Sequence, residues 1–171
     1  MNEYESQPIP HTPPHSREAE QAVLGAVLLS AEVLDDLSGI IEPDYFYYPE
    51  HVTIYQTMIG MSGQAIDVVT LSEANNTISL DYLVELADVT PSTSNALRYA
   101  EIVGERKKER DLIDAGRLFI DVCNDRSLTH QDRVERSQVA FTALSSERQA
   151  STQVGMKTSA AAVLESLDAR L

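Results

Sequence analysis

The residues that could do chemistry in this sequence are its histidines, its paired carboxylates and its single cysteine. The histidines are His11, His15, His51 and His130. None has a second histidine or a cysteine at the spacing that metal ligands use. His11 and His15 are four residues apart, but two prolines lie between them, so no helix aligns them. The sequence therefore predicts no metal site.

The paired acidic residues do not form a catalytic pair. Glu18 and Glu20, like Asp35 and Asp36, are one or two residues apart, and side chains at that spacing on a helix point in different directions. We interpret both pairs as solvated acidic faces. The segment 155–158 (GMKT) is the nearest approach to a phosphate-binding loop, but the pattern G-x-x-x-x-G-K-[ST] is absent. We therefore predict no catalytic residue and no cofactor-binding residue in this chain.

Cys123 is the only cysteine, so an internal disulfide is impossible, which fits a reducing compartment. It lies in an apolar run, with no basic neighbour that would lower the pKa of its thiol. We predict a packed, unreactive thiol. No run approaches the ~20 apolar residues of a membrane span, and residues 1–15 lack the basic and apolar regions of a signal peptide. The expected location is the cytoplasm.

Charge is divided unevenly along the chain, whose net charge is −14. Residues 1–97 hold one basic residue, Arg17, and fifteen acidic residues, whereas residues 98–148 hold ten of each. Binding to nucleic acid needs a basic surface that displaces counterions from phosphates. Direct DNA binding is therefore not expected, and a protein partner is favoured.

The main basic cluster is Arg106, Lys107, Lys108 and Arg110, with acidic residues interleaved among them. One interpretation is a solvated helix surface with some pairing between neighbouring turns. A second is a contact for the acidic surface of a partner, and another copy of this chain is a candidate for that partner. A third, direct contact with DNA, is disfavoured by the distribution of charge along the chain.

The elements that would position these residues are helices. Glycine and proline are few, and β-branched alternation is scarce. Apolar residues at three- and four-residue spacing, with turn residues between them, predict five successive helices. These helices cover about 16–29, 31–40, 49–61, 67–74 and 80–88. Gly25 predicts a close approach of another helix, and Phe46 is expected in the core.

A long helix then leads into a helical hairpin. A helix-start signal at 90–95 precedes about thirty residues without proline, which is long for one helix. A loop at 125–129 and a helix over about 131–148 follow, and so short a loop predicts antiparallel packing. The expected organisation is all-α: a disordered arm (1–14), a compact helical head (15–103), an antiparallel helical hairpin (104–148), a flexible linker (149–157) and a short linker helix (158–171).

An apolar stripe on the hairpin would be exposed on a monomer, so the sequence predicts an oligomer. The expected interface residues are Leu112, Leu118, Phe119, Val122, Phe141 and Leu144. The linker helix is short for an isolated helix in water, and it also needs a partner surface. Its expected docking face is Val163, Leu164 and Leu167.

Several short motifs occur in a fixed order, among them PPHSREAEQAVLG (13–25), DYFY (44–47), IDVVTL (66–71), TPS (90–92) and YAEIV (99–103). This ordered set resembles the N-terminal region of bacterial and phage replicative helicases of the DnaB family. The resemblance covers roughly residues 13–110. The chain differs from the family pattern between Leu71 and Tyr82, where it is shorter.

The resemblance implies an N-terminal collar domain whose dimers form a trimer of dimers above six motor domains. Primase or a helicase loader would be its partner, and the linker helix would dock on the adjacent motor domain. The ATPase motifs of that motor are absent from this chain, so ATP and magnesium are expected only if a motor domain follows. The parent protein would then be an ATP-dependent DNA helicase acting in DNA replication.

The alternative is a stand-alone homologue of the collar that regulates a helicase ring as loader, inhibitor or adaptor. Whether the reading frame continues beyond Leu171 into a phosphate-binding loop distinguishes the two interpretations.

Overall fold

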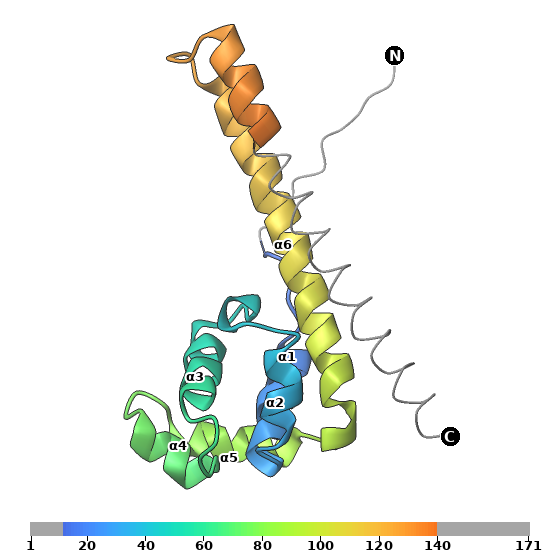
Figure 1. Ribbon diagram of the computed structural model, residues 1–171, viewed down its shortest axis with the longest axis vertical. Helices are drawn as coiled ribbons and strands as arrows, with labels where there is room; N and C mark the ends of the chain where they lie inside the picture. The colour runs from blue at the N-terminus through green and yellow to red at the C-terminus, as the bar shows by residue number, and fades with distance from the viewer. Residues whose placement is uncertain (1–11, 140–171) are drawn as a thin grey trace, which may run out of the picture. The chain divides into compact units, whose positions relative to one another are not determined.

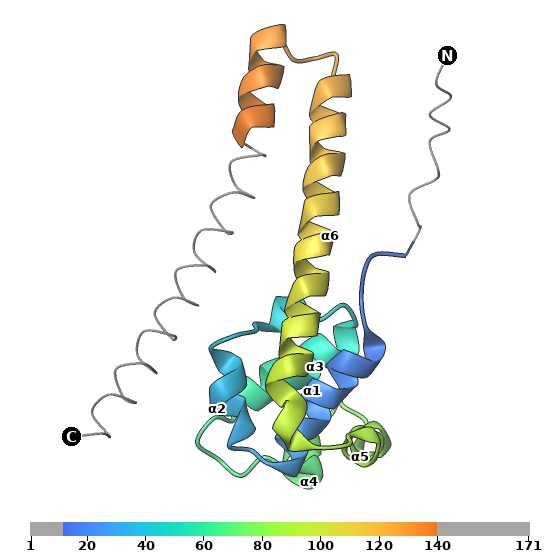
Figure 2. The ribbon, with the colours of Figure 1, turned by 90° about the vertical axis from the view of Figure 1, so that its right-hand side faces the viewer.

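The computed structural model describes residues 12–139, drawn in colour in Figures 1 and 2. The chain divides between Arg110 and Asp111 into two compact units. We call their described residues the N-terminal unit (12–110) and the C-terminal unit (111–139). These residues form helices and turns and include no strand, which confirms the predicted all-α fold. Within them, no helix is both long enough and apolar enough to cross a membrane.

The N-terminal unit contains five complete helices, two short 3-10 turns and the start of α6. In chain order the elements are α1 (Arg17–Leu29), α2 (Val33–Ser38), the 3-10 turn η1 (Pro43–Tyr45), α3 (Pro49–Gly60), α4 (Val68–Ala74), α5 (Leu80–Val89), the 3-10 turn η2 (Thr93–Asn95) and α6 (Ala96–Asn124). The helices follow the predicted ranges closely, except that α2 is shorter than 31–40. Turns at both ends take up the remaining residues of that range.

Side-chain caps fix where helices of this unit begin. Ser16 accepts a hydrogen bond from the amide of Ala19 at the start of α1. Asp67 and Thr70 form a reciprocal capping box at the start of α4. Both caps were predicted from the sequence, and each such cap stabilises a helix by about 1 kcal/mol.

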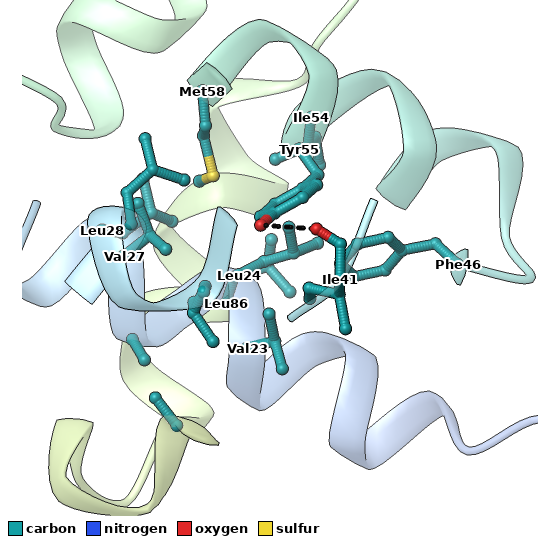
Figure 3. Close-up of a cluster of buried hydrophobic side chains, with 14 of the residues drawn as sticks. Val23, Leu24, Val27, Leu28, Ile41, Phe46, Ile54, Tyr55, Met58 and Leu86 are labelled. Carbon is teal, nitrogen blue, oxygen red and sulfur yellow. Dashed lines mark hydrogen bonds between the residues drawn. The ribbon is translucent and has the colours of Figure 1, made fainter. Parts of the chain in front are cut away.

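One hydrophobic core fills the N-terminal unit, with α1 at its centre. Residues 22–28 of α1 are all buried. Phe46 is 4% exposed, which confirms its predicted place in the core. Figure 3 shows side chains from α1, α3, α5 and the segment before α3 meeting in this core: Val23, Leu24, Val27, Leu28, Ile41, Phe46, Ile54, Tyr55, Met58 and Leu86.

The hydroxyl of Tyr55 is a polar group inside this core. It donates a hydrogen bond to the carbonyl oxygen of Ile41 over 3.4 Å, drawn as the dashed line in Figure 3. Burial raises the pKa of Tyr55 to about 12, because the charged phenolate is disfavoured away from water. The hydroxyl therefore stays protonated and remains a donor.

Helices α1 and α5 approach each other closely at Gly25. A Cβ atom at this position would overlap both Thr90 Oγ1 and the carbonyl oxygen of Leu86. The hydroxyl of Thr90 donates to that same carbonyl over 2.7 Å. The close helix approach predicted at Gly25 is thus confirmed, and a residue without a side chain is required there.

The C-terminal unit is a helical hairpin. The second half of α6 ends at Asn124, and the next helix begins at position 130, one residue earlier than predicted. Between them, Asp125 accepts hydrogen bonds from the amide and the hydroxyl of Ser127. Thr129 and Asp132 cap the second helix reciprocally. In Figures 1 and 2 this helix runs back antiparallel to the end of α6, as predicted.

Candidate functional site

A buried polar network joins α1, α3, α5 and the loop after η1. Glu20 of α1 and His51 of α3 are each 1% exposed. The Glu20 carboxylate accepts the N–H groups of Tyr47 at 2.9 Å and Tyr48 at 3.4 Å, and it lies 2.7 Å from His51 Nδ1. On the other side of the ring, His51 Nε2 lies 2.6 Å from the hydroxyl oxygen of Tyr82 in α5. Four segments are therefore held together by one carboxylate and one imidazole.

The expectation of a solvated acidic face is wrong for Glu20, although Glu18 is exposed. Glu20 is three, four and seven residues before Val23, Leu24 and Val27, so its side chain lies on the apolar side of α1. That spacing is the signal in the sequence that could have identified Glu20 as buried. A buried carboxylate is stable here because hydrogen-bond donors replace the water that it loses.

The hydroxyl of Tyr82 extends the network to α1 and the carboxylate of Glu20 fixes one of its protons. The hydroxyl of Tyr82 accepts from Gln21 Nε2 over 3.3 Å, and its hydrogen bond with Arg17 raises the pKa of that guanidinium. A carboxylate can only accept, so His51 Nδ1 carries a proton and donates it to Glu20.

Aromatic rings and basic groups alternate around the loop that follows η1. The rings of His15 and Tyr47 stack with centroids 4.4 Å apart, and the Arg110 guanidinium lies 5.8 Å from the Tyr47 centroid. The Arg17 guanidinium lies 5.0 Å from the centroid of Tyr48. Cation–π contacts at the surface are worth about 0.5–1 kcal/mol each. These contacts help to fix the loop whose backbone N–H groups also donate to Glu20.

Two residues of the basic cluster that was considered for partner binding make contacts within the N-terminal unit. Arg110 donates to the carbonyl of Pro14 over 2.9 Å and to the carbonyl of Tyr45. Lys107 Nζ lies 3.5 Å from the carboxylate of Asp44. These contacts tie α6 to η1 and to the residues before α1.

The other two residues of the basic cluster lie at the surface. Arg106 pairs with Glu109 over 2.7 Å, and Lys108 is exposed. Arg106 also lines a surface hollow of about 570 Å³, together with Arg17 and Tyr48. A role of this cluster in partner binding stays a prediction.

The predicted oligomer-interface residues that the structure describes lie on α6 in the C-terminal unit. Leu112, Leu118 and Phe119 are 64%, 52% and 47% exposed, and Val122 is half-buried. Ile120, which was not among the predicted residues, is 54% exposed. Within the described residues, Leu112, Leu118 and Phe119 are therefore not covered by the chain's own packing.

Five predicted residues lie outside the described part of the chain: Phe141, Leu144, Val163, Leu164 and Leu167.

Cys123 differs from expectation. It is an exposed free thiol, whereas its apolar neighbours in sequence had suggested a packed one. The hairpin has too few elements to cover this part of α6, so apolar neighbours in sequence do not bury it. Residues 12–139 contain no group of three His, Cys, Asp or Glu side chains that could hold a metal ion.

Residues 12–105 match the family described as "DnaB-like helicase N terminal domain". The chain belongs to this family. A curated relative, the replicative DNA helicase DnaB of Pasteurella multocida, is 34% identical over 151 residues, covering 82% of this chain and 32% of the relative. The chain thus spans about a third of the length of that relative.

Solved structures of the family share the fold. The crystal structure of the N-terminal domain of DnaB helicase from Mycobacterium tuberculosis matches with a TM-score of 0.73 and 28% identity, covering 77% of this chain and 99% of that domain. A DnaB-like replicative helicase, described together with its interactions with primase, matches with a TM-score of 0.63 and 23% identity, covering 75% of this chain and 31% of that protein.

Proposed function

We propose that this chain is the collar of a hexameric replicative DNA helicase: the N-terminal region through which subunits dimerise and partners bind during DNA replication. The family match over residues 12–105 carries this proposal. The near-complete coverage of the M. tuberculosis domain supports it. ATP and magnesium would then bind in a motor domain that follows this chain, and the proposed compartment is the cytoplasm.

The exposed apolar residues of the C-terminal unit support self-association. Leu112 and Phe119 lie seven residues apart and therefore on one side of α6, and Leu118 lies about 100° further round the helix. Each is about half exposed or more. Exposed apolar side chains gathered in one section of a helix are typical of interaction sites. In a dimer, the same section of α6 on two chains would form a self-complementary interface.

Analytical ultracentrifugation of the full chain tests this interface. The wild-type chain should sediment as a dimer or a trimer of dimers, and Phe119→Glu combined with Phe141→Glu should sediment as a monomer. All seven tyrosines precede residue 100, so their near-UV circular dichroism reports whether the N-terminal unit is still folded. Val69→Glu is a matched control, since Val69 is exposed in the N-terminal unit. A double variant that keeps the wild-type mass would refute the interface.

Primase is the proposed partner, with a helicase loader as a further possibility. The support is the related DnaB-like helicase that was described with its interactions with primase. Binding between the full chain and the primase of the same organism can be measured by calorimetry. A chain that is strictly monomeric and binds no replication protein would contradict the proposed function.

A further inference from the structure

A surface hollow of about 570 Å³ lies at the start of α1 in the N-terminal unit. Arg17 and Glu18 of α1 line it together with Tyr48, which precedes α3, and with Ile102 and Arg106 of α6. Its volume falls within the range of about 300–1,000 Å³ that is typical of small-molecule sites. The hollow therefore brings two guanidinium groups from distant parts of the sequence to the wall of one ligand-sized space.

The guanidinium of Arg17 is held in place by two neighbouring tyrosines. It forms a hydrogen bond with the hydroxyl of Tyr82, and it lies 5.0 Å from the centroid of the Tyr48 ring. A guanidinium carries five N–H donors, so these contacts leave it able to donate to a ligand. Because its position is already fixed, little conformational entropy is lost when a ligand binds.

The guanidinium of Arg106 is held in a similar way on the other wall. Its Nη1 donates to both oxygens of the Glu109 carboxylate, over 2.8 and 2.7 Å. The N–H groups of Nε and Nη2 take no part in this pair. Arg106 is therefore fixed by one of its nitrogens and keeps donors for a second acceptor.

The lining is more positive than the unit to which it belongs. It holds two guanidinium groups, the imidazole of His15 and one carboxylate, that of Glu18. The chain has a net charge of −14, and Arg17 is the only basic residue among positions 1–97. Like charges repel each other, so an anion is repelled by most of the N-terminal unit and attracted locally by the two arginines.

We propose that this hollow binds the phosphate groups of a small molecule, either a nucleotide or a free diphosphate. A phosphate group brings about two negative charges and three acceptor oxygens, so it can accept from two guanidinium groups at once. A carboxylate has two oxygens and one charge, and a single guanidinium matches it in a bidentate pair. Two arginines from separate elements therefore suit phosphate better. The proposal does not depend on the collar function, since it needs neither a motor domain nor a partner protein.

Phosphorus NMR of pyrophosphate mixed with the full chain tests this site. Saturable broadening of the pyrophosphate signal gives the dissociation constant, and a second titration with ADP, in the absence of metal ions, shows whether a nucleoside adds affinity. Glutarate, a dicarboxylate, and adenosine, a nucleoside without phosphate, are then added as competitors. Equal affinities for pyrophosphate and ADP would support a diphosphate site, and tighter binding of ADP would support a nucleotide site.

Three substitutions in the lining and one control locate the site. Arg17→Gln and Arg106→Gln should each weaken binding about tenfold or more, because each removes charge-assisted hydrogen bonds. Glu18→Gln should tighten binding several-fold, because it removes the negative charge from the lining. The control is Arg98→Gln, whose arginine pairs with Glu101 on the surface of α6 over three residues, as Arg106 does with its own partner.

The control should stay within about twofold of wild type, because an exposed ion pair outside the hollow contributes little. Tyrosine circular dichroism checks that each variant is folded, and the tighter binding expected for Glu18→Gln is a result that unfolding cannot produce. Absence of saturation below about 10 mM pyrophosphate, an affinity weaker than about −3 kcal/mol, would overturn the proposal. Equal losses in Arg98→Gln and Arg17→Gln would also overturn it, as would displacement of pyrophosphate by glutarate or adenosine at equal concentration.

Discussion

The N-terminal unit buries most of its apolar side chains, whereas the C-terminal unit leaves its own exposed. In the first, Val23, Leu24 and Val27 are 0% exposed. In the second, Leu112 is 64% exposed and Phe119 is 47% exposed, and no residue among positions 111–139 is buried. Five helices around one core can enclose residues 22–28 of α1, whereas two helices share a single interface and leave their outer faces open.

The N-terminal unit is therefore stabilised by contacts within itself. The C-terminal unit would gain stability from contact with another chain. The N-terminal unit has a closed core, a buried polar network and capped helices, so its stability should depend on changes inside it. The C-terminal unit has local caps and an open apolar surface, which supports its proposed role in joining chains. Substitutions of the same kind should therefore have different effects in the two units.

The largest effect is expected for Glu20→Ala in the N-terminal unit. Three donors lose their acceptor: two backbone N–H groups and the ring of His51. Each unsatisfied buried donor costs about 1–3 kcal/mol, so we expect a loss of about 3–5 kcal/mol in the free energy of unfolding. Urea denaturation followed by tyrosine circular dichroism measures it.

The matched control is Glu18→Ala, two residues earlier in the same turn. Glu18 is exposed, so this change should cost less than about 1 kcal/mol, chiefly through the helix dipole. Equal losses in the two variants would show that Glu20 does not hold the network together.

The same substitution, glycine to alanine, should change stability in opposite directions in the two units. At Gly25 a Cβ would overlap Thr90 and the Leu86 carbonyl, so Gly25→Ala should destabilise by about 1–3 kcal/mol. At Gly116 an added Cβ would meet no neighbouring group within 4 Å, and alanine favours helix by up to about 1 kcal/mol. Gly116→Ala should therefore stabilise α6.

Hydrogen exchange of backbone amides measures both glycine variants, because it resolves α1 and α5 from the second half of α6. Faster exchange is expected in α1 and α5 for Gly25→Ala, and slower exchange near position 116 for Gly116→Ala. A neutral result at Gly25 would mean that the two helices do not approach as closely as their contact indicates.

Local features of this fold could be predicted from the sequence, because the signal and its effect lie within one turn. The caps at Ser16 and Asp67, the start of α3 at Pro49 and the burial of Phe46 all follow from short patterns. The close approach at Gly25 was also predictable, because glycine inside a helix usually has a packing reason.

The polar network could not be predicted in the same way. His51 is 31 residues from Glu20 and 31 residues from Tyr82, so the three meet only when α1, α3 and α5 have packed. The exposure of Cys123 could not be predicted either, because it also depends on how the helices pack. Its neighbours in sequence are apolar, but whether they are covered depends on how many elements surround them.

The smallest effect on stability is expected at the aspartate caps of the helices, and here the two units should respond in the same way. Asp132 in the C-terminal unit accepts hydrogen bonds from the hydroxyl and the amide of Thr129, and these bonds lower the pKa of its carboxyl group. Asp67 in the N-terminal unit has its pKa lowered by hydrogen bonds from Thr70 and Val69. Because the folded state holds the lower pKa, each cap stabilises the chain above the ordinary aspartate pKa, and this contribution is lost as pH falls through the lowered value.

An NMR titration of the aspartate carboxyl carbons should therefore find both groups titrating below the ordinary pKa of an aspartate in a short unstructured peptide, which serves as the reference. Asp132→Asn should remove the acid-dependent loss of helix in the hairpin while Asp67 still titrates low. If Asp132 titrates at the ordinary aspartate pKa, the cap of the second hairpin helix is not formed in solution. The two units would then differ in local structure as well as in packing, and partner contact would have to order the start of that helix.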